Sequence, residues 1–219
     1  NLSSASAFSS HDNLAEHHKN HLLPHRYARD SSAISSQLEF YFSKMYSESN
    51  AFLFNSGMSA LSAVIHTLAQ RATRIITFDV IYRKTQSLII DLCEISHREH
   101  INLTFTPGSI SQLAKEMQSE NVLFVIEAPS NPFLRIIDIE LIKTEFPNAL
   151  IIIDFTLEGL LNGEKYIQYA DIAVTSCTKY ISGHNDLIAG LALVNNDCYA
   201  GDLWKCRSTN GTIIDPLAS

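Results

Sequence analysis

A lysine flanked by two hydroxyl-bearing residues is the feature of the sequence that most directly suggests chemistry. Lys179 lies in the segment Ser176-Cys-Thr-Lys-Tyr180, directly after the apolar run 172–175. A lysine amine at the end of a buried strand has a lowered pKa when it is partly desolvated, and it then attacks carbonyl carbons as a nucleophile. A solvated lysine in a surface turn would fit the same local pattern, so the prediction depends on the groups around it.

Two other apolar runs end in a carboxylic acid. Residues 150–153 lead into Asp154, and residues 122–126 lead into Glu127, which is followed by Ala128-Pro-Ser-Asn-Pro132. A buried carboxylate needs a cation or N–H donors close by, although an aspartate at this place could also cap a helix or close a turn. The two prolines predict a rigid turn that presents the side-chain amide of Asn131 at the same edge.

The segment Asn55-Ser-Gly-Met-Ser59 is a candidate anion site, because it comes directly before a helical pattern. Free N–H groups and the dipole at a helix start bind phosphate, although the same residues would serve as an ordinary helix cap. A phosphate site, a carboxylate, an amide and a reactive lysine together suit pyridoxal 5′-phosphate (PLP). Lys179 would hold its aldehyde as a Schiff base, and Asp154 would pair with its pyridine nitrogen. A nucleotide-binding α/β module is the alternative, but the chain contains no G-x-G-x-x-G or Walker loop.

These candidate residues need elements that bring them together, and the sequence predicts an alternation of strands and helices. Helical spacing or helix signals occur at 37–46, 58–69, 85–93, 109–117 and 139–146. Apolar runs typical of buried strands occur at 74–78, 101–105, 122–126, 150–153, 172–175 and 187–194, with a shorter run at 51–54. This order predicts an α/β fold with a mostly parallel sheet covered on both faces. Ligands of such sheets bind beyond the carboxyl ends of the strands.

The composition indicates a soluble globular protein. The chain has 219 residues, 46% of them hydrophobic, and a formal net charge of −7, which argues against disorder. The acidic balance gives no general attraction for nucleic acid or anionic membranes, and no run approaches the roughly 20 apolar residues of a membrane span. Four cysteines without a C-x-x-C pair indicate reduced thiols and a cytoplasmic location. Residues 1–10 contain no basic region followed by an apolar run, so no signal peptide is expected there, and the absence of an initiator Met predicts a start inside a longer product.

Histidines are concentrated in the polar segment 1–36. A histidine-rich tract can bind metal, but no carboxylate or cysteine pattern completes a site here, so a solvated arm is the favoured interpretation and no metal is expected. Five of the nine histidines of the chain belong to this group: His11, His17, His18, His21 and His25.

The motifs resemble those of a known family, the Cys/Met-metabolism PLP enzymes of fold type I. The resemblance is carried by Ser56-Gly-Met-Ser-Ala60, Glu127-Ala-Pro-Ser-Asn-Pro-Phe-Leu-Arg135 and Ser176-Cys-Thr-Lys-Tyr-Ile-Ser-Gly-His-Asn-Asp186, and it extends over about residues 27–216. It implies a three-layer αβα large PLP-binding domain, aspartate-aminotransferase-like, over 37–219. Residues 1–36 would be an arm contacting a neighbouring subunit, and the smaller C-terminal domain of the family would be absent from this chain.

The resemblance also implies residue roles. Lys179 would form the Schiff base and shuttle protons, Asp154 would keep the pyridine nitrogen protonated, and Tyr82 would stack on the ring and assist the leaving group. Thr156 is retained after the pyridine aspartate. The remaining cofactor contacts would come from Asn131 at the ring hydroxyl, from Gly57, Met58, Ser176 and Thr178 at the phosphate, and from Tyr27 and Arg29 at the phosphate of a neighbouring subunit. The last pair implies a homo-oligomer, a dimer or tetramer.

The activity that the resemblance implies is a transsulfuration-type reaction of methionine biosynthesis. Several segments look most like cystathionine γ-synthase, which predicts γ-replacement on an activated homoserine ester with a thiol such as cysteine. A carbon–sulfur lyase, similar to cystathionine or methionine γ-lyase, is the alternative, as is a non-catalytic fragment that binds only PLP or a partner. Three features depart from the family pattern: Ser32-Ala-Ile34 after the Tyr-x-Arg segment, Glu158 near the predicted site, and the lack of an assignable arginine for the substrate carboxylate.

Overall fold

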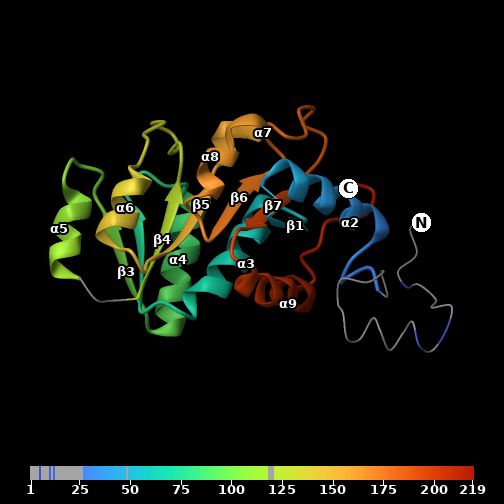
Figure 1. Cartoon of the computed structure of the whole chain (residues 1–219), viewed down its shortest axis with the longest axis horizontal. Coiled ribbons are helices and arrows are strands. Elements are labelled where there is room, and N and C mark those ends of the chain that lie inside the picture. Colours follow the sequence, from blue (N-terminus) through green and yellow to red (C-terminus); the bar gives the residue numbers. More distant parts are fainter. Residues whose placement is uncertain (1–4, 6–9, 11, 13–26, 48, 118–120) are drawn as a thin grey trace.

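The computed structural model describes residues 5, 10, 12, 27–47, 49–117 and 121–219 of the chain. Within them a sheet of seven strands lies between two layers of helices (Figure 1). The N-terminal histidine group lies outside the described residues. Among the described helices, none combines the length and the apolar character that a membrane span requires.

The sheet is mixed but mostly parallel, as predicted. Its spatial order is β1-β7-β6-β5-β4-β2-β3, and β2 to β6 run parallel to one another, while β7 is antiparallel to both β6 and β1. The strands are β1 (Asn50–Phe54), β2 (Arg74–Phe78), β3 (Glu99–Leu103), β4 (Val122–Glu127), β5 (Leu150–Asp154), β6 (Ile172–Ser176) and β7 (Gly190–Val194). The carboxyl ends of the parallel strands therefore meet at one edge, where ligands are expected.

The two faces of the sheet bury separate apolar cores. One core packs against α3 (Gly57–Ala69), α4 (Arg83–Ser96) and α9 (Ala200–Asn210). The other packs against α2 (Ala33–Met45), α5 (Ser109–Glu116), α6 (Ile139–Glu145) and α8 (Glu164–Ile167). The short elements η1 (Thr156–Glu158), α7 (Gly159–Asn162) and η2 (Asp197–Tyr199) complete the set. This arrangement gives the three-layer αβα architecture expected from the sequence.

The boundaries differ from the sequence prediction in a few places, each for a local reason. Helix α2 begins at Ala33 rather than at 37, because Ser32 and Ser35 form a reciprocal capping box. Strand β7 begins only at Gly190, because Ala189 instead forms backbone hydrogen bonds with the hydroxyl of Thr178. Helix α9 was not predicted, since it lacks an apolar stripe and buries only Leu203 and Arg207.

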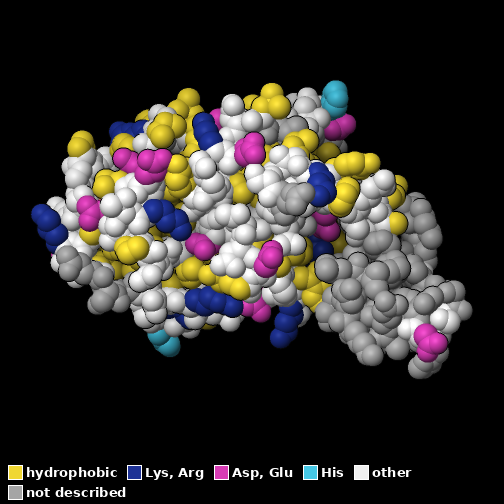
Figure 2. Space-filling view, in the orientation of Figure 1, with side chains coloured by type: hydrophobic (Ala, Val, Ile, Leu, Met, Phe, Trp, Pro, Cys, Tyr) yellow, Lys and Arg dark blue, Asp and Glu magenta, His cyan; other side chains and the backbone are white. Residues whose placement is uncertain are grey.

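The surface carries charges of both signs. On the face shown in Figure 2, basic and acidic side chains are interspersed, and neither sign forms a continuous patch.

A buried ion pair closes the β1 edge of the sheet. Arg207 is 1% exposed and pairs with Glu39 of α2. The N–H group of Leu53, in edge strand β1, donates to Glu39 (2.8 Å), and Arg207 donates to the carbonyl of Leu53 (3.0 Å). The two side chains thus satisfy backbone groups that an edge strand would otherwise leave unpaired.

Removal of Arg207 alone should therefore be costly. Arg207→Met leaves Glu39 and the Leu53 carbonyl without their partner, and we expect a loss of about 3 kcal/mol or more in the free energy of unfolding, measured by urea titration. Asp202→Asn is the matched control, since it removes the charge from the exposed pair with Arg71 and should cost about 1 kcal/mol or less. Equal losses in the two variants would contradict this account.

Candidate functional site

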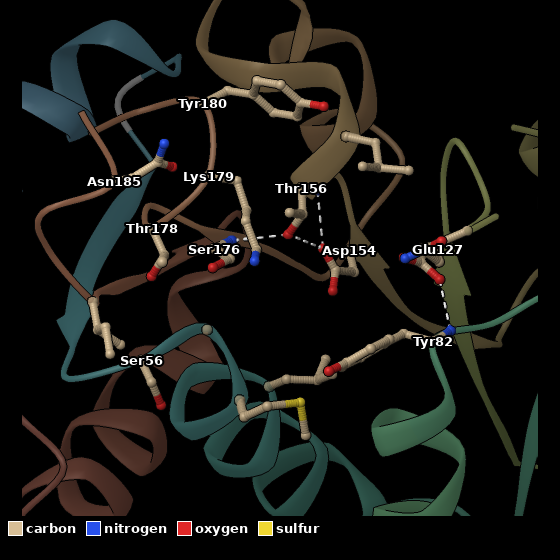
Figure 3. Close-up of a pocket in the computed structure, with 16 residues that line it drawn as sticks. Ser56, Tyr82, Glu127, Asp154, Thr156, Ser176, Thr178, Lys179, Tyr180 and Asn185 are labelled. Atoms are coloured by element: carbon tan, nitrogen blue, oxygen red, sulfur yellow. Dashed lines mark hydrogen bonds between the residues drawn. The ribbon is translucent and has the colours of Figure 1, made fainter. Parts of the chain in front are cut away.

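A cavity of about 510 Å³ lies at the carboxyl ends of β4, β5 and β6 (Figure 3). Nine of the residues that the sequence analysis assigned to a cofactor line it: Gly57, Met58, Tyr82, Asn131, Asp154, Thr156, Ser176, Thr178 and Lys179. These residues come from segments far apart in the sequence. The parallel strands bring them together because each segment follows the end of a strand.

Asp154 is held by a hydrogen-bond network with Thr156. The hydroxyl of Thr156 donates to Asp154 Oδ1 (2.6 Å), and the Thr156 backbone N–H donates to the same oxygen (3.0 Å). The hydroxyl in turn accepts from the Ser176 N–H (2.9 Å). Burial raises the pKa of Asp154, and the two bonds from Thr156 oppose that rise. Among the described residues no cation pairs with Asp154, so the site suits a ligand that brings a protonated nitrogen.

The start of α3 forms the second wall of the cavity. Ser56 caps this helix by accepting from the Ser59 N–H (3.1 Å). Gly57 and Met58 occupy its first two positions, where backbone N–H groups have no acceptor inside the helix. A Cβ on Gly57 would lie 2.7 Å from the Cβ of Ser176, so only glycine allows the helix to start this close to β6. The result is a small cradle of N–H groups and hydroxyls that fits a phosphate group.

Two hydroxyl-bearing side chains of the lysine segment face this cradle differently. Ser176 Oγ has no hydrogen bond to any described residue, so it is available to a ligand. The Thr178 hydroxyl donates to the Ala189 carbonyl (3.2 Å) and accepts from the Ala189 N–H (3.0 Å). Thr178 would therefore have to redirect its proton to bind an anion. Lys179 extends between Ser176 and Asp154 (Figure 3), and within the described part of the chain its amine forms no hydrogen bond or ion pair.

Tyr82 lies on another wall of the cavity and is connected to a buried glutamate. The side chain of Tyr82 is 43% exposed, and its backbone N–H donates to Glu127 Oε2 (2.7 Å). The backbone of Asn131 also hydrogen-bonds to this carboxylate. Glu127 is paired in register with Asp154 across β4 and β5, so the two side chains lie on the same face of the sheet. Burial and the charge of Asp154 raise the pKa of Glu127 to about 7, against the two backbone hydrogen bonds.

The sequence places Glu127 at the end of a strand without indicating a role for it. The same signal that singled out Asp154, an apolar run ending in a carboxyl group, could have singled out Glu127 as well. Other lining residues carried no comparable signal, because they are apolar or lie in loops: Leu61, Leu157, Tyr180, Asn185 and Ile188.

Glu158, the acid that the sequence places near the site, points away from the cavity. Glu158 pairs with Lys165 (2.7 Å) and accepts from the hydroxyl of Tyr166 (2.8 Å), and it does not line the cavity. Cys177 is buried outside the cavity, as strand alternation predicted, and burial raises the pKa of its thiol to about 12. Neither residue therefore contributes a reactive group to the site.

Tyr27 and Arg29 lie away from the cavity of their own chain. The Arg29 guanidinium stacks over the Tyr27 ring at 5.1 Å from its centroid. The next residue, Asp30, is held by α9, through Ser208 and through Arg207, which donates to the Asp30 carbonyl (3.4 Å). A role at the phosphate of a neighbouring subunit stays a prediction. Over the described residues, no three His, Cys, Asp or Glu side chains are grouped to hold a metal ion.

The raised pKa of Glu127 has a consequence for stability. The folded state keeps a proton on Glu127 up to about pH 7, and the unfolded state loses it near pH 4.5. The free energy of unfolding should therefore fall as the pH rises from 5 to 8, with a contribution from Glu127 on the order of 2 kcal/mol. Glu127→Gln should flatten this slope in urea titrations, whereas Glu116→Gln, which removes an exposed carboxylate, should not. A slope that Glu127→Gln leaves unchanged would refute the assignment.

Comparison with known proteins gives one family. Residues 1–219 match the model described as Cys/Met metabolism PLP-dependent enzyme. An L-methionine γ-lyase from Fusobacterium nucleatum subsp. polymorphum is 30% identical over 78% of this chain and 44% of its own length. The chloroplastic cystathionine γ-synthase 1 of Nicotiana tabacum is 32% identical over 75% of this chain and 31% of its own length. The chain thus spans about half or less of the length of these curated relatives.

Solved structures show the same fold. Cystathionine γ-synthase from Xanthomonas oryzae pv. oryzae superposes with a TM-score of 0.84 at 23% identity, over 100% of this chain and 54% of that one. A methionine γ-lyase from Micromonospora echinospora gives a TM-score of 0.84 at 21% identity, over 99% of this chain and 56% of that one. The large domain of fold-type-I PLP enzymes is therefore the architecture seen here. The chain belongs to the Cys/Met metabolism family of PLP-dependent enzymes.

Proposed function

We propose that this chain is the cofactor-binding large domain of a PLP-dependent enzyme that acts on small sulfur-related amino acids. The observation that carries the proposal is the grouping of Lys179, Asp154 and the first turn of α3 around one cavity. An amine, a buried carboxylate without a cation and a set of N–H donors match the aldehyde, the pyridine nitrogen and the phosphate of PLP. The chemistry of these donors thus fits the cofactor of the family.

Each part of the cofactor has a candidate partner. Asp154 would pair with the pyridine nitrogen and keep it protonated, with Thr156 fixing the carboxylate. Asn131 would approach the ring hydroxyl, and Tyr82 would stack on the ring. Gly57, Met58, Ser176 and Thr178 would hold the phosphate. When bound, PLP supplies an electron sink that stabilises negative charge on the α-carbon of an amino acid.

The chain's own residues would then control protons and water. Lys179 is the one amine-bearing side chain that lines the cavity in the described part of the chain, so in its neutral form it would remove the α-proton and then help to move a β-proton. Leu61, Leu157 and Ile188 supply apolar walls that exclude water from this part of the site. No arginine lines the cavity among the described residues, so the substrate carboxylate would be bound by a group that does not line it.

The favoured reaction is γ-replacement on an activated homoserine ester by a thiol such as cysteine, as in cystathionine γ-synthase. Several motif segments support it through their similarity to that enzyme. A carbon–sulfur lyase is the second candidate, and the relatives named as methionine γ-lyase and cystathionine β-lyase support it. The choice of acceptor depends on pocket shape, and the residues around Lys179 serve both reactions.

We further propose a homo-oligomer of the cytoplasm. Tyr27 and Arg29 lie outside their own cavity, which suits a role at the phosphate of a neighbouring copy. The four cysteines are unpaired, as expected for a reducing compartment. A dimer would be sufficient for this role, because Tyr27 and Arg29 of each copy could then reach the cavity of the other copy.

Loss of the lysine gives a direct test of the cofactor claim. Purified protein with added PLP should show the visible absorbance of lysine-bound cofactor. Lys179→Ala should abolish the band, because among the described residues no other side chain that lines the cavity carries an amine. Lys115→Ala is the matched control, since it removes an exposed lysine of α5 that does not line the cavity. A colourless wild-type protein that gains no band with PLP would contradict the proposal.

Product analysis separates the candidate reactions. With PLP, an activated homoserine ester and cysteine, γ-replacement should yield a thioether amino acid, whereas elimination should yield a 2-oxo acid and ammonia. Formation of the thioether supports the synthase assignment. Cofactor binding without either product would instead support a domain that does not complete the reaction.

A further inference from the structure

One buried carboxylate joins two separate loops of the cavity. Glu127 is 6% exposed and ends β4. It accepts from the backbone N–H of Tyr82 (2.7 Å), in the loop that follows β2, and it also hydrogen-bonds to the backbone of Asn131, in the loop that follows β4. Both loops line the cavity. Their relative position is therefore set through a single side chain.

The hydrogen bond between Glu127 and the Tyr82 N–H caps the start of α4. Tyr82 is the N-cap residue of α4, and its own side chain makes no capping hydrogen bond. In a capping box, a glutamate in the first turn accepts from the N-cap N–H, but the first turn of α4 has no acid and begins with Arg83 and Lys84. Glu127 supplies the missing acceptor from a strand 45 residues away. Negative charge at this place is also favoured by the helix dipole.

The carboxylate is fixed at the sheet edge by its register. Glu127 and Asp154 are in-register partners on β4 and β5, and the two carboxyl groups lie side by side in Figure 3, with Tyr82 below Glu127. A group held by a rigid strand places a loop more accurately than contacts within the loop can. Such accurate placement is needed if Tyr82 is to stack on the face of the cofactor ring while Asn131 contacts the hydroxyl at its edge.

We propose that Glu127 is a positioning residue that presets Tyr82 and Asn131 for the cofactor, acting as a remote cap of α4. The proposal rests on the proposed function for its consequence, the alignment of the two residues against PLP. Its structural part, the ordering of both loops by one carboxylate, belongs to the ligand-free protein. Glu127 acts through its neighbours in this assignment and has no contact with reacting atoms.

The test compares three variants of the full chain. Glu127→Ala removes the acceptor, Glu127→Gln keeps a neutral acceptor of the same shape, and Asp138→Ala is the matched control. Asp138 caps α6 by accepting from the Leu141 N–H (2.9 Å), and it does not line the cavity. Amide hydrogen exchange of the ligand-free proteins is followed by NMR, and PLP affinity is measured by absorbance titration.

In Glu127→Ala, the backbone amides of Tyr82 and Asn131 should each exchange at least about tenfold faster than in the wild-type protein. The amide of Leu141 should keep its wild-type exchange rate. Asp138→Ala should show the reverse pattern. Glu127→Ala should also weaken PLP binding by at least about tenfold, and Glu127→Gln should recover most of both losses.

Two results would overturn the proposal. One is that the amides of Tyr82 and Asn131 exchange at the wild-type rate in Glu127→Ala. The other is that this variant binds PLP with the affinity of the wild-type protein. A uniform rise of exchange across the chain would point to general destabilisation and would also refute a positioning role. A wild-type protein that binds no PLP would refute the proposed function instead, and the exchange data would still decide whether Glu127 orders the two loops.

Discussion

The parallel register of β4 and β5 is the constraint on which the site depends. It places Glu127 and Asp154 opposite each other at the carboxyl edge, where burial raises the pKa of both carboxyl groups. Desolvation and mutual repulsion make this arrangement unfavourable unless donors are supplied. Thr156 supplies them to Asp154, and the backbones of Tyr82 and Asn131 supply them to Glu127. The need to satisfy two buried acids therefore fixes the positions of three loops.

The opposite wall depends on close packing rather than charge. Gly57 lets the first turn of α3 approach β6, and Gly190 lets β7 pass the carbonyl of Ser56, where a Cβ would lie 2.3 Å from that oxygen. These two contacts hold the N–H groups of α3 next to Ser176. A side chain at either position would separate the helix start from the strand ends. An anion cradle thus forms beside the two acids, which gives the cavity one end suited to negative charge and one suited to positive charge.

The sequence predicted what depends on local pattern and missed what depends on tertiary contacts. Apolar runs located the strands, and their ends identified Asp154 and Lys179, because strand periodicity and the position of sites in parallel sheets are general rules. The cap that Glu127 provides for α4 could not be predicted, since its partner is 45 residues away. Helix α9 was missed for a similar reason: it is held by the buried pair of Arg207 and Glu39 rather than by an apolar stripe.

Glu158 shows how the fold limits the negative charge of the cavity. Its position at the end of η1 would allow a third carboxylate near Asp154 and Glu127, which would raise the pKa of both further and weaken binding of an anionic phosphate. Lys165 and Tyr166 of α8 bind Glu158 instead, and the ion pair lowers its pKa despite partial burial. Helix α8 thus removes one acid from the electrostatics of the site. The departure from the family pattern at this residue is compensated by neighbours that the motif itself does not contain.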